Sequence, residues 1–397
     1  MVPGGNGMGK SGSGRIASLD GFRAISILMV LFGHLSSTRS FPVSLETYKN
    51  TAGDLAHLGV LVFFVISGFL ITSLLMSERE KTGTISLKKF YLRRVLRIFP
   101  AFYALILALI VANLMGWISL SGHDLAYALT YTVNYDPSGS WPIGHLWSLS
   151  IEEQFYLLWP LTLLLLRQRR ALMVAIAAIF MGPLVRAGIL EWVFHVNPHS
   201  ALANMSIFPA MFDYLATGCA LALLRPWLLT QAWYLRLTGS RWLVLAVVLT
   251  FLINRLSGYT LVMLLGSPVM NVCIALLIES STRHADSLAG RFLNWKPIAF
   301  VGVLSYSLYL WQQPFLDRHS DAWVTAFPQN LVLAFAAALL SYFVVERSFL
   351  GLRRRLERTT SLPVHTDSVR ETPAEELPAN ELDPGYSRAS ALDRYRG

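Results

Sequence analysis

Two residues that could carry out chemistry lie in one apolar stretch, residues 19–35, which holds Arg23 near its start and His34 near its end. On a helix the eleven residues from one to the other rise roughly 16 Å and return to nearly the same face. Burying a cation and an imidazole against lipid would be costly, so both are expected to face a polar interior and to belong to a functional site. The alternative is an anchoring arginine and a hydrogen-bonded histidine that serves packing.

A basic cluster follows in the segment FYLRRVLRIFPAFY, residues 90–103. Arg94 and Arg97 are three residues apart and therefore share a helical face. Guanidinium groups at this spacing suit the bidentate capture of phosphates, such as those of coenzyme A. The alternative is ordinary juxtamembrane charge that attracts anionic lipid.

An acidic pair lies in GHLWSLSIEEQFYLLWP, residues 144–160, where Glu152 and Glu153 are adjacent inside an apolar run. A carboxylate near His34 could fix the tautomer of the imidazole and raise its basicity, as acyl transfer requires. One of the two acids could instead be protonated, or paired with an arginine that locks helices together. The sequence leaves open which glutamate faces the site.

Weaker signals accompany these clusters. The segment SYSLYLWQQP, residues 305–314, offers hydroxyls, Trp311 and two amides to an acceptor sugar, although an aromatic belt at the membrane interface explains its rings equally well. Ser67-Gly68 favours close helix packing. Glu346, followed by Arg347, suits either a structural ion pair or the mouth of a donor site, and Asp213 is interpreted as structural.

The elements that position these residues are predicted to be transmembrane helices. The 397 residues are 54% hydrophobic and only 14% charged, and the apolar residues come in runs of about twenty. We therefore expect an all-α membrane protein, a bundle of about ten transmembrane helices. The predicted spans lie near 19–37, 55–76, 98–116, 145–166, 171–190, 204–224, 241–256, 261–279, 298–316 and 329–349.

The net charge of +9 is concentrated between and after the apolar runs, which indicates membrane topology rather than binding of nucleic acid. Its distribution predicts that both termini are cytoplasmic in a multi-pass protein of the cell (plasma or inner) membrane. We expect a flexible leader over residues 1–18, a transmembrane domain over 19–350 and a disordered tail over 359–397.

Two catalytic motifs are absent from the sequence: an H-E-x-x-H pair and a G-x-S-x-G elbow. Histidine, cysteine and carboxylate residues show no tight ligand spacing, so no metal is predicted. Cys219 and Cys273 both lie in apolar runs and imply no disulfide framework.

Six motifs in this order resemble the acyltransferase 3 family of integral membrane O-acyltransferases, over about residues 15–350. They are LDGFRAISILMVLFGH, FFVISGFLIT, FYLRRVLRIFPAFY, HLWSLSIEEQFYLLWP, SYSLYLW and VVERSF. The family moves acyl groups, commonly acetyl, from cytoplasmic acyl-CoA to hydroxyls of carbohydrates or macrolide-type products.

The resemblance implies roles for individual residues, each matched to a family motif. Arg23 and His34 match a motif of arginine, ten residues and histidine, and Arg94 and Arg97 match an R-x-x-R motif. Glu152 and Glu153 match a pair of adjacent acids, and Glu346 matches the acid of the last span. Where the family often has a second histidine, this chain has Gln312, which concentrates the chemistry on His34.

The hypothesis is that acyl-CoA docks with its phosphates on Arg94, Arg97 and Arg23. His34, oriented by Glu152 or Glu153, would then take the proton of the acceptor hydroxyl as this attacks the thioester. A covalent acyl-histidine intermediate is the competing variant. The rival function is a transporter or flippase of lipid-linked glycans, which inverted repeats would favour, and none is evident in the sequence.

Overall fold

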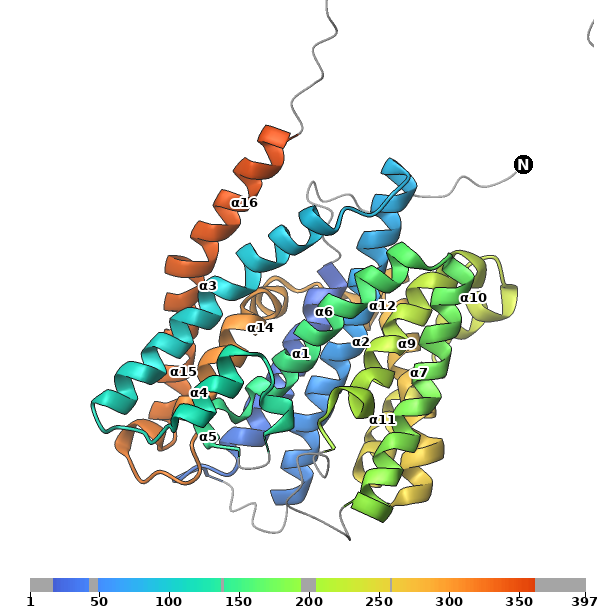
Figure 1. Ribbon diagram of the computed structural model, residues 1–397. Coiled ribbons are helices and arrows are strands. Elements are labelled where there is room, and N and C mark those ends of the chain that lie inside the picture. The colour runs from blue at the N-terminus through green and yellow to red at the C-terminus, as the bar shows by residue number, and fades with distance from the viewer. Residues whose placement is uncertain (1–16, 43–48, 137–138, 194–204, 258, 361–397) are drawn as a thin grey trace, which may run out of the picture. The chain divides into compact units, whose positions relative to one another are not determined.

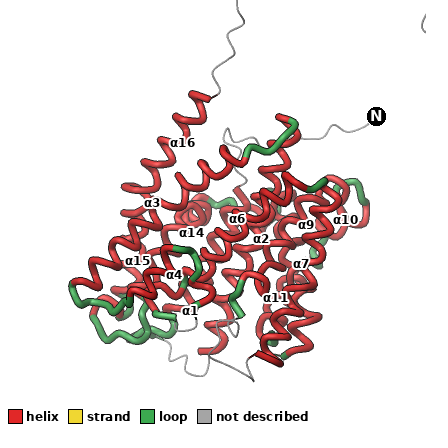
Figure 2. The backbone as a smooth tube through the Cα atoms, in the orientation of Figure 1, coloured by secondary structure: helices red, strands yellow, loops and turns green. Residues whose placement is uncertain are grey.

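The computed structural model describes residues 17–42, 49–136, 139–193, 205–257 and 259–360. It divides into a unit that ends at Arg354 and a second unit that begins at Arg355, and every site residue discussed below lies in the first unit. The predicted leader and tail lie outside the described residues, except for residues 17–18 and 359–360, which are helical. Every regular element in the described ranges is a helix, as the predicted fold class requires (Figure 2).

Each of the ten predicted spans coincides with a helix (Figure 1). The long helices are α1 (Ala17–Leu35), α2 (Lys49–Thr82), α3 (Leu87–Leu114), α6 (Leu146–Leu165), α7 (Gln168–Gly188), α9 (Phe208–Leu228), α11 (Leu243–Arg255), α12 (Ser267–Arg283), α14 (Lys296–Phe315) and α15 (Gln329–Leu340). Short helices connect or extend them: α4 (Gly122–Leu129), α5 (Trp141–Gly144), α10 (Ala232–Thr238), α13 (Leu288–Leu293) and α16 (Arg347–Thr360). A π-helical segment, Ser341–Glu346, joins α15 to α16.

Six helices of the described chain are long and apolar enough to cross a membrane, or seven if the bent pair α10 and α11 counts as one span. The chain is therefore a multi-pass membrane protein. Helices α6, α9 and α14 have 20, 21 and 20 residues but are not among the six, because polar residues such as Glu152, Asp213 and Gln312 lower their hydropathy. The ten-span count and the cytoplasmic termini stay predictions.

The helices that form the site are held together by close packing around α1 and α2. Helix α1 packs against α2 and α14, and α2 packs against α9. At the α2–α9 crossing, a Cβ on Gly68 would overlap the carbonyl oxygen of Leu215, and one on Gly218 would overlap that of Val65. Only glycine allows the two backbones this approach, so the packing role predicted for Gly68 is confirmed.

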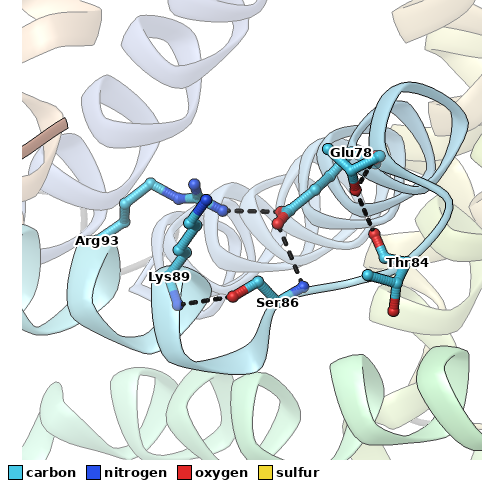
Figure 3. A network of polar contacts seen from close by, with 6 residues as sticks. Glu78, Thr84, Ser86, Lys89 and Arg93 are labelled. Carbon is cyan, nitrogen blue, oxygen red and sulfur yellow. Dashed lines mark hydrogen bonds and ion pairs between the residues drawn. The ribbon is translucent and has the colours of Figure 1, made fainter. Parts of the chain in front are cut away.

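The turn between α2 and α3 fixes the start of the helix that carries the basic cluster (Figure 3). Glu78 accepts hydrogen bonds from the Ser86 backbone N–H at 3.2 Å and from Arg93 Nη2 at 3.0 Å. The Ser86 hydroxyl in turn caps α3 by accepting from the Lys89 backbone N–H. Glu78 near the end of α2 thus holds the first turn of α3, and this contact sets the rotation of α3 about its axis.

Candidate active site

A cavity of about 400 Å³, here called the basic cavity, lies between α1, α2, α3, α6 and α14 and the segment Ser341–Glu346. Its lining brings together residues that are far apart in the sequence. The charged side chains that line it are Asp20, Arg23, Arg94, Arg97, Glu152 and Glu346. The sequence prediction had singled out five of these six, and the structure places all five around one space.

The three arginines of the basic cavity are half-buried and make no ion pair with any residue in the described ranges. The guanidinium of Arg94 lies over the Tyr156 ring, 4.4 Å from its centroid. Arg93, one residue earlier, is paired with Glu78 instead. The turn between α2 and α3 thus occupies one arginine of the cluster and leaves Arg94 and Arg97 with hydrogen-bond donors available to a ligand.

The acids differ in whether they line the basic cavity. Glu152 lines the basic cavity together with Ser67, and the positive charges that act on it are those of Arg23, Arg94 and Arg97. Glu153 lines neither cavity described here, although the charges of Arg94 and Glu152 also act on it. The structure therefore assigns Glu152, not Glu153, to the basic cavity. Glu346 accepts a hydrogen bond from Ser307, while its neighbour Arg347 lies over the Phe343 ring.

A second cavity of about 350 Å³, here called the histidine cavity, contains His34. Two further imidazoles line it, those of His57 and His145. Val60 and Tyr309 line both cavities, so the two spaces adjoin at these side chains. The other residues that line the histidine cavity are Val30, Gly33, Ser37, Ala56, Gly139, Trp141, Gly144, Trp147, Gln313 and Arg318.

Tyr309 is held firmly at the boundary. Its hydroxyl donates to the carbonyl oxygen of His145 at 2.8 Å and is 2.6 Å from the Ser148 hydroxyl. The side chain is 7% exposed. A phenol with both hydrogen bonds satisfied stays in place, so Tyr309 is a fixed part of the boundary between the two cavities.

A relay of two amides orients His34. Nδ1 of His34 is 2.8 Å from Oε1 of Gln312, Gln312 Nε2 donates to Oε1 of Gln313 at 3.2 Å, and Gln313 Nε2 donates to the Trp141 carbonyl oxygen at 3.0 Å. The carbonyl can only accept, which fixes the Gln313 amide and then that of Gln312. Oε1 of Gln312 therefore faces His34, so Nδ1 carries the proton and Nε2 is the basic nitrogen.

This arrangement corrects the expectation that Glu152 or Glu153 orients His34. Gln312 does so, and Glu152 lines the adjoining cavity. Gln312, which stands where the family often has a second histidine, contacts the imidazole directly. Trp311, the aromatic residue suggested for the acceptor, lines neither cavity.

Two other imidazoles line the histidine cavity, those of His57 and of His145, which belongs to the same segment as the acidic pair. His145, the N-cap residue of α6, is hydrogen-bonded through Nε2 to the Leu310 carbonyl oxygen at 3.1 Å, and its buried Nδ1 has no hydrogen-bond partner. His57 stacks on Trp147 with the ring centroids 6.0 Å apart. In the described ranges no three His, Cys, Asp or Glu side chains are grouped closely enough to hold a metal ion.

Comparison with known proteins gives a consistent set of relatives. A family described as an acyltransferase domain matches residues 16–346. A Staphylococcus aureus (strain COL) protein named provisionally as an O-acetyltransferase is 30% identical over 366 residues, which cover 84% of this chain and 57% of the relative. The O-acetyltransferase OatA of Staphylococcus aureus (strain NCTC 8325 / PS 47) is 30% identical over 327 residues, or 76% of this chain and 50% of OatA. The chain thus spans about half the length of these curated relatives. No solved structure matches it.

Proposed function

The chain belongs to this acyltransferase family, and we propose that it is a membrane O-acyltransferase that uses acyl-CoA, with acetyl-CoA as the first candidate, to acylate a hydroxyl group. The acceptor is a carbohydrate or a macrolide-type molecule. The observation that supports this proposal most strongly is the pair of adjoining cavities, one lined by arginines without ion-pair partners and the other by an oriented imidazole.

The basic cavity suits the donor. Arg94 and Arg97 offer planar guanidinium groups that bind phosphate oxygens in pairs, and Arg23 adds a third cation. Arg23 and His34 lie on the same helix, roughly 16 Å apart along its axis. An extended pantetheine arm is comparable in length, so phosphates bound at the arginines place the thioester at the boundary formed by Val60 and Tyr309.

The histidine cavity suits the acceptor and the chemical step. The acceptor hydroxyl gives its proton to Nε2 of His34 while its oxygen attacks the thioester carbonyl carbon. The C–S bond then breaks, and the imidazolium returns the proton to the departing thiolate, so that CoA leaves as the thiol. Gln312 holds the imidazole in the tautomer that this step requires, because its Oε1 accepts from Nδ1–H.

Direct transfer is preferred to a covalent acyl-histidine, because the adjoining cavities let the donor and the acceptor meet at one point. The two variants differ in a single turnover without acceptor. Direct transfer leaves no labelled protein, whereas the covalent variant leaves one labelled acyl group on His34.

The proposed function is tested with the full-length protein in lipid nanodiscs and radiolabelled acetyl-CoA. Release of the CoA thiol together with labelled ester on an acceptor glycan extract is the expected result, and it separates an enzyme from a transporter. His34→Ala should abolish both signals, whereas His123→Ala, which removes an exposed imidazole on α4, should keep them. Normal ester formation by His34→Ala would contradict the proposal.

A further inference from the structure

The histidine cavity is lined by one permanent cation, the exposed side chain of Arg318. Among the described residues that line it, Arg318 is the only lysine or arginine, and no aspartate or glutamate is present. Arg318 makes no ion pair and no side-chain hydrogen bond with the described residues. The basic cavity differs in this respect, since Glu152 and Glu346 accompany its arginines. An unpaired guanidinium beside a substrate space is a binding group for an anion supplied by the ligand.

The guanidinium is also held in place. Its Cζ atom lies 4.5 Å from the centroid of the Trp141 ring, a cation–π contact that uses none of the guanidinium's hydrogen-bond donors on a protein acceptor. Trp141 is fixed in turn by Gln313, to whose carbonyl oxygen its indole N–H donates at 3.1 Å and whose amide donates back to the Trp141 carbonyl at 3.0 Å. Arg318 thus stands on a rigid aromatic platform.

The same indole connects this cation to the catalytic imidazole. The ring of His34 meets the Trp141 ring edge-on at 5.6 Å between centroids. Together with the Arg318 contact, this places the guanidinium within about 10 Å of the imidazole. A hydroxyl at His34 and an anionic group at Arg318 would therefore belong to the same sugar unit or to directly linked units.

We propose that the acceptor carries an anionic substituent, a carboxylate or a phosphate, which Arg318 binds while the hydroxyl to be acylated lies at His34. This inference rests on the proposed function and narrows its substrate class to acidic glycans, in preference to neutral sugars and neutral macrolides. Trp141 serves both groups, because it supports the guanidinium and packs against the imidazole.

The test compares glycosides that differ only in charge. The full-length protein in phosphatidylcholine nanodiscs with saturating acetyl-CoA is offered methyl glucuronide, methyl glucoside 6-phosphate or neutral methyl glucoside, and Kd and the KM for acyl transfer are measured for each. A charged hydrogen bond predicts that both acidic glycosides are preferred by about tenfold to a hundredfold. Arg318→Gln should abolish this preference and Arg318→Lys should retain part of it.

The matched control is Arg39→Gln. Arg39 is an exposed arginine that donates to the Asp321 carbonyl oxygen at 3.0 Å and lines neither cavity, so its loss should leave the preference intact.

Equal affinities for acidic and neutral glycosides, or a preference that survives Arg318→Gln, would overturn the inference. So would an effect of Arg318→Gln that appears only in nanodiscs with anionic phosphatidylglycerol, since that result assigns the arginine to a lipid headgroup. Failure of the proposed function looks different, because no thiol is then released from acetyl-CoA whichever residue stands at position 318.

Discussion

Arg186 on α7 and the arginines of the basic cavity are all cations placed among apolar helices, but their surroundings differ. Arg186 donates to both carboxylate oxygens of Asp213 on α9, at 2.8 and 2.9 Å. Asn271 on α12 adds a third donor to that carboxylate at 3.2 Å, and the Tyr214 ring lies 5.1 Å from the guanidinium. Both members of the pair are buried, and neither lines the basic or the histidine cavity.

The arginines of the basic cavity share a space of about 400 Å³ with Glu152 and Glu346 but form no ion pair in the described chain. The comparison teaches that an ionisable residue within a membrane span does not by itself mark a functional site. A charge that is ion-paired and hydrogen-bonded within the protein joins helices, and a charge that forms no ion pair beside a cavity is available to a ligand.

The largest effect on activity is expected at His34. His34→Ala should reduce the rate of acyl transfer by about 10²- to 10⁴-fold, because it removes the general base, while the affinity for acyl-CoA stays close to normal. Transfer rates and donor affinity are measured on the same preparation. Loss of donor affinity in parallel with activity would show that His34 belongs to the donor site and would weaken the division into two cavities.

A large effect on stability, with little effect on chemistry, is expected at the buried pair. Asp213→Ala should lower stability by about 3–5 kcal/mol, because Arg186 is left buried without its partner. The melting temperature in nanodiscs measures this change, and turnover per folded molecule should remain normal. In the double variant Arg186→Met/Asp213→Leu, which removes both charges, most of the lost stability should return. A persistent loss of turnover in that variant would mean that the pair contributes to function.

A smaller effect, on the KM for acyl-CoA alone, is expected when arginines of the basic cavity are replaced. Arg94→Gln and Arg97→Gln should each raise the KM for acyl-CoA by about tenfold to a hundredfold, as the loss of a charged hydrogen bond to phosphate predicts, without lowering the melting temperature. Arg93→Gln is the matched control, because Arg93 is paired with Glu78. An effect of Arg93→Gln equal to that of its neighbours would remove the distinction between paired and unpaired arginines.

The smallest effects on kcat are expected from changes to the two relay amides, and the effect should be smaller for the amide that lies further from the imidazole. Gln312→Met, similar in size but without an acceptor, should lower kcat about tenfold to a hundredfold with the donor KM unchanged, because the His34 tautomer is no longer fixed. Gln313→Met, one step further away, should lower it less. Gln312→Glu restores an acceptor for Nδ1–H and should recover kcat relative to Gln312→Met. A purely structural role of Gln312 would instead lower the melting temperature and give no such recovery.

Much of this arrangement could be predicted from the sequence, for identifiable physical reasons. Apolar runs of about twenty residues gave the helices, and the spacing of Arg94 and Arg97 gave their common face toward the basic cavity. Polar groups in apolar runs also indicated Arg23 and His34, both of which line a cavity.

What the sequence did not indicate depends on contacts between distant segments. Gln312 meets His34 across 278 residues, and no pattern within either segment specifies that contact. The choice between Glu152 and Glu153 depends on the rotation of α6 against α2 and α3, which only the packed bundle fixes. The pairing of Arg186 with Asp213 likewise requires α7 and α9 to pack side by side.

The central claim is that the thioester passes from the basic cavity to His34 at the boundary formed by Val60 and Tyr309, and Val60→Phe tests it most directly. The larger side chain should block the boundary between the cavities and leave the charged residues of both in place. Val62→Phe, at a buried position of α2 that lines neither cavity, controls for overpacking of the helix. Acyl-CoA affinity and acyl transfer are measured together for both variants. The account predicts that Val60→Phe binds acyl-CoA with nearly unchanged affinity and transfers at least about tenfold more slowly than Val62→Phe. Transfer by Val60→Phe at the rate of the unmodified protein would contradict it.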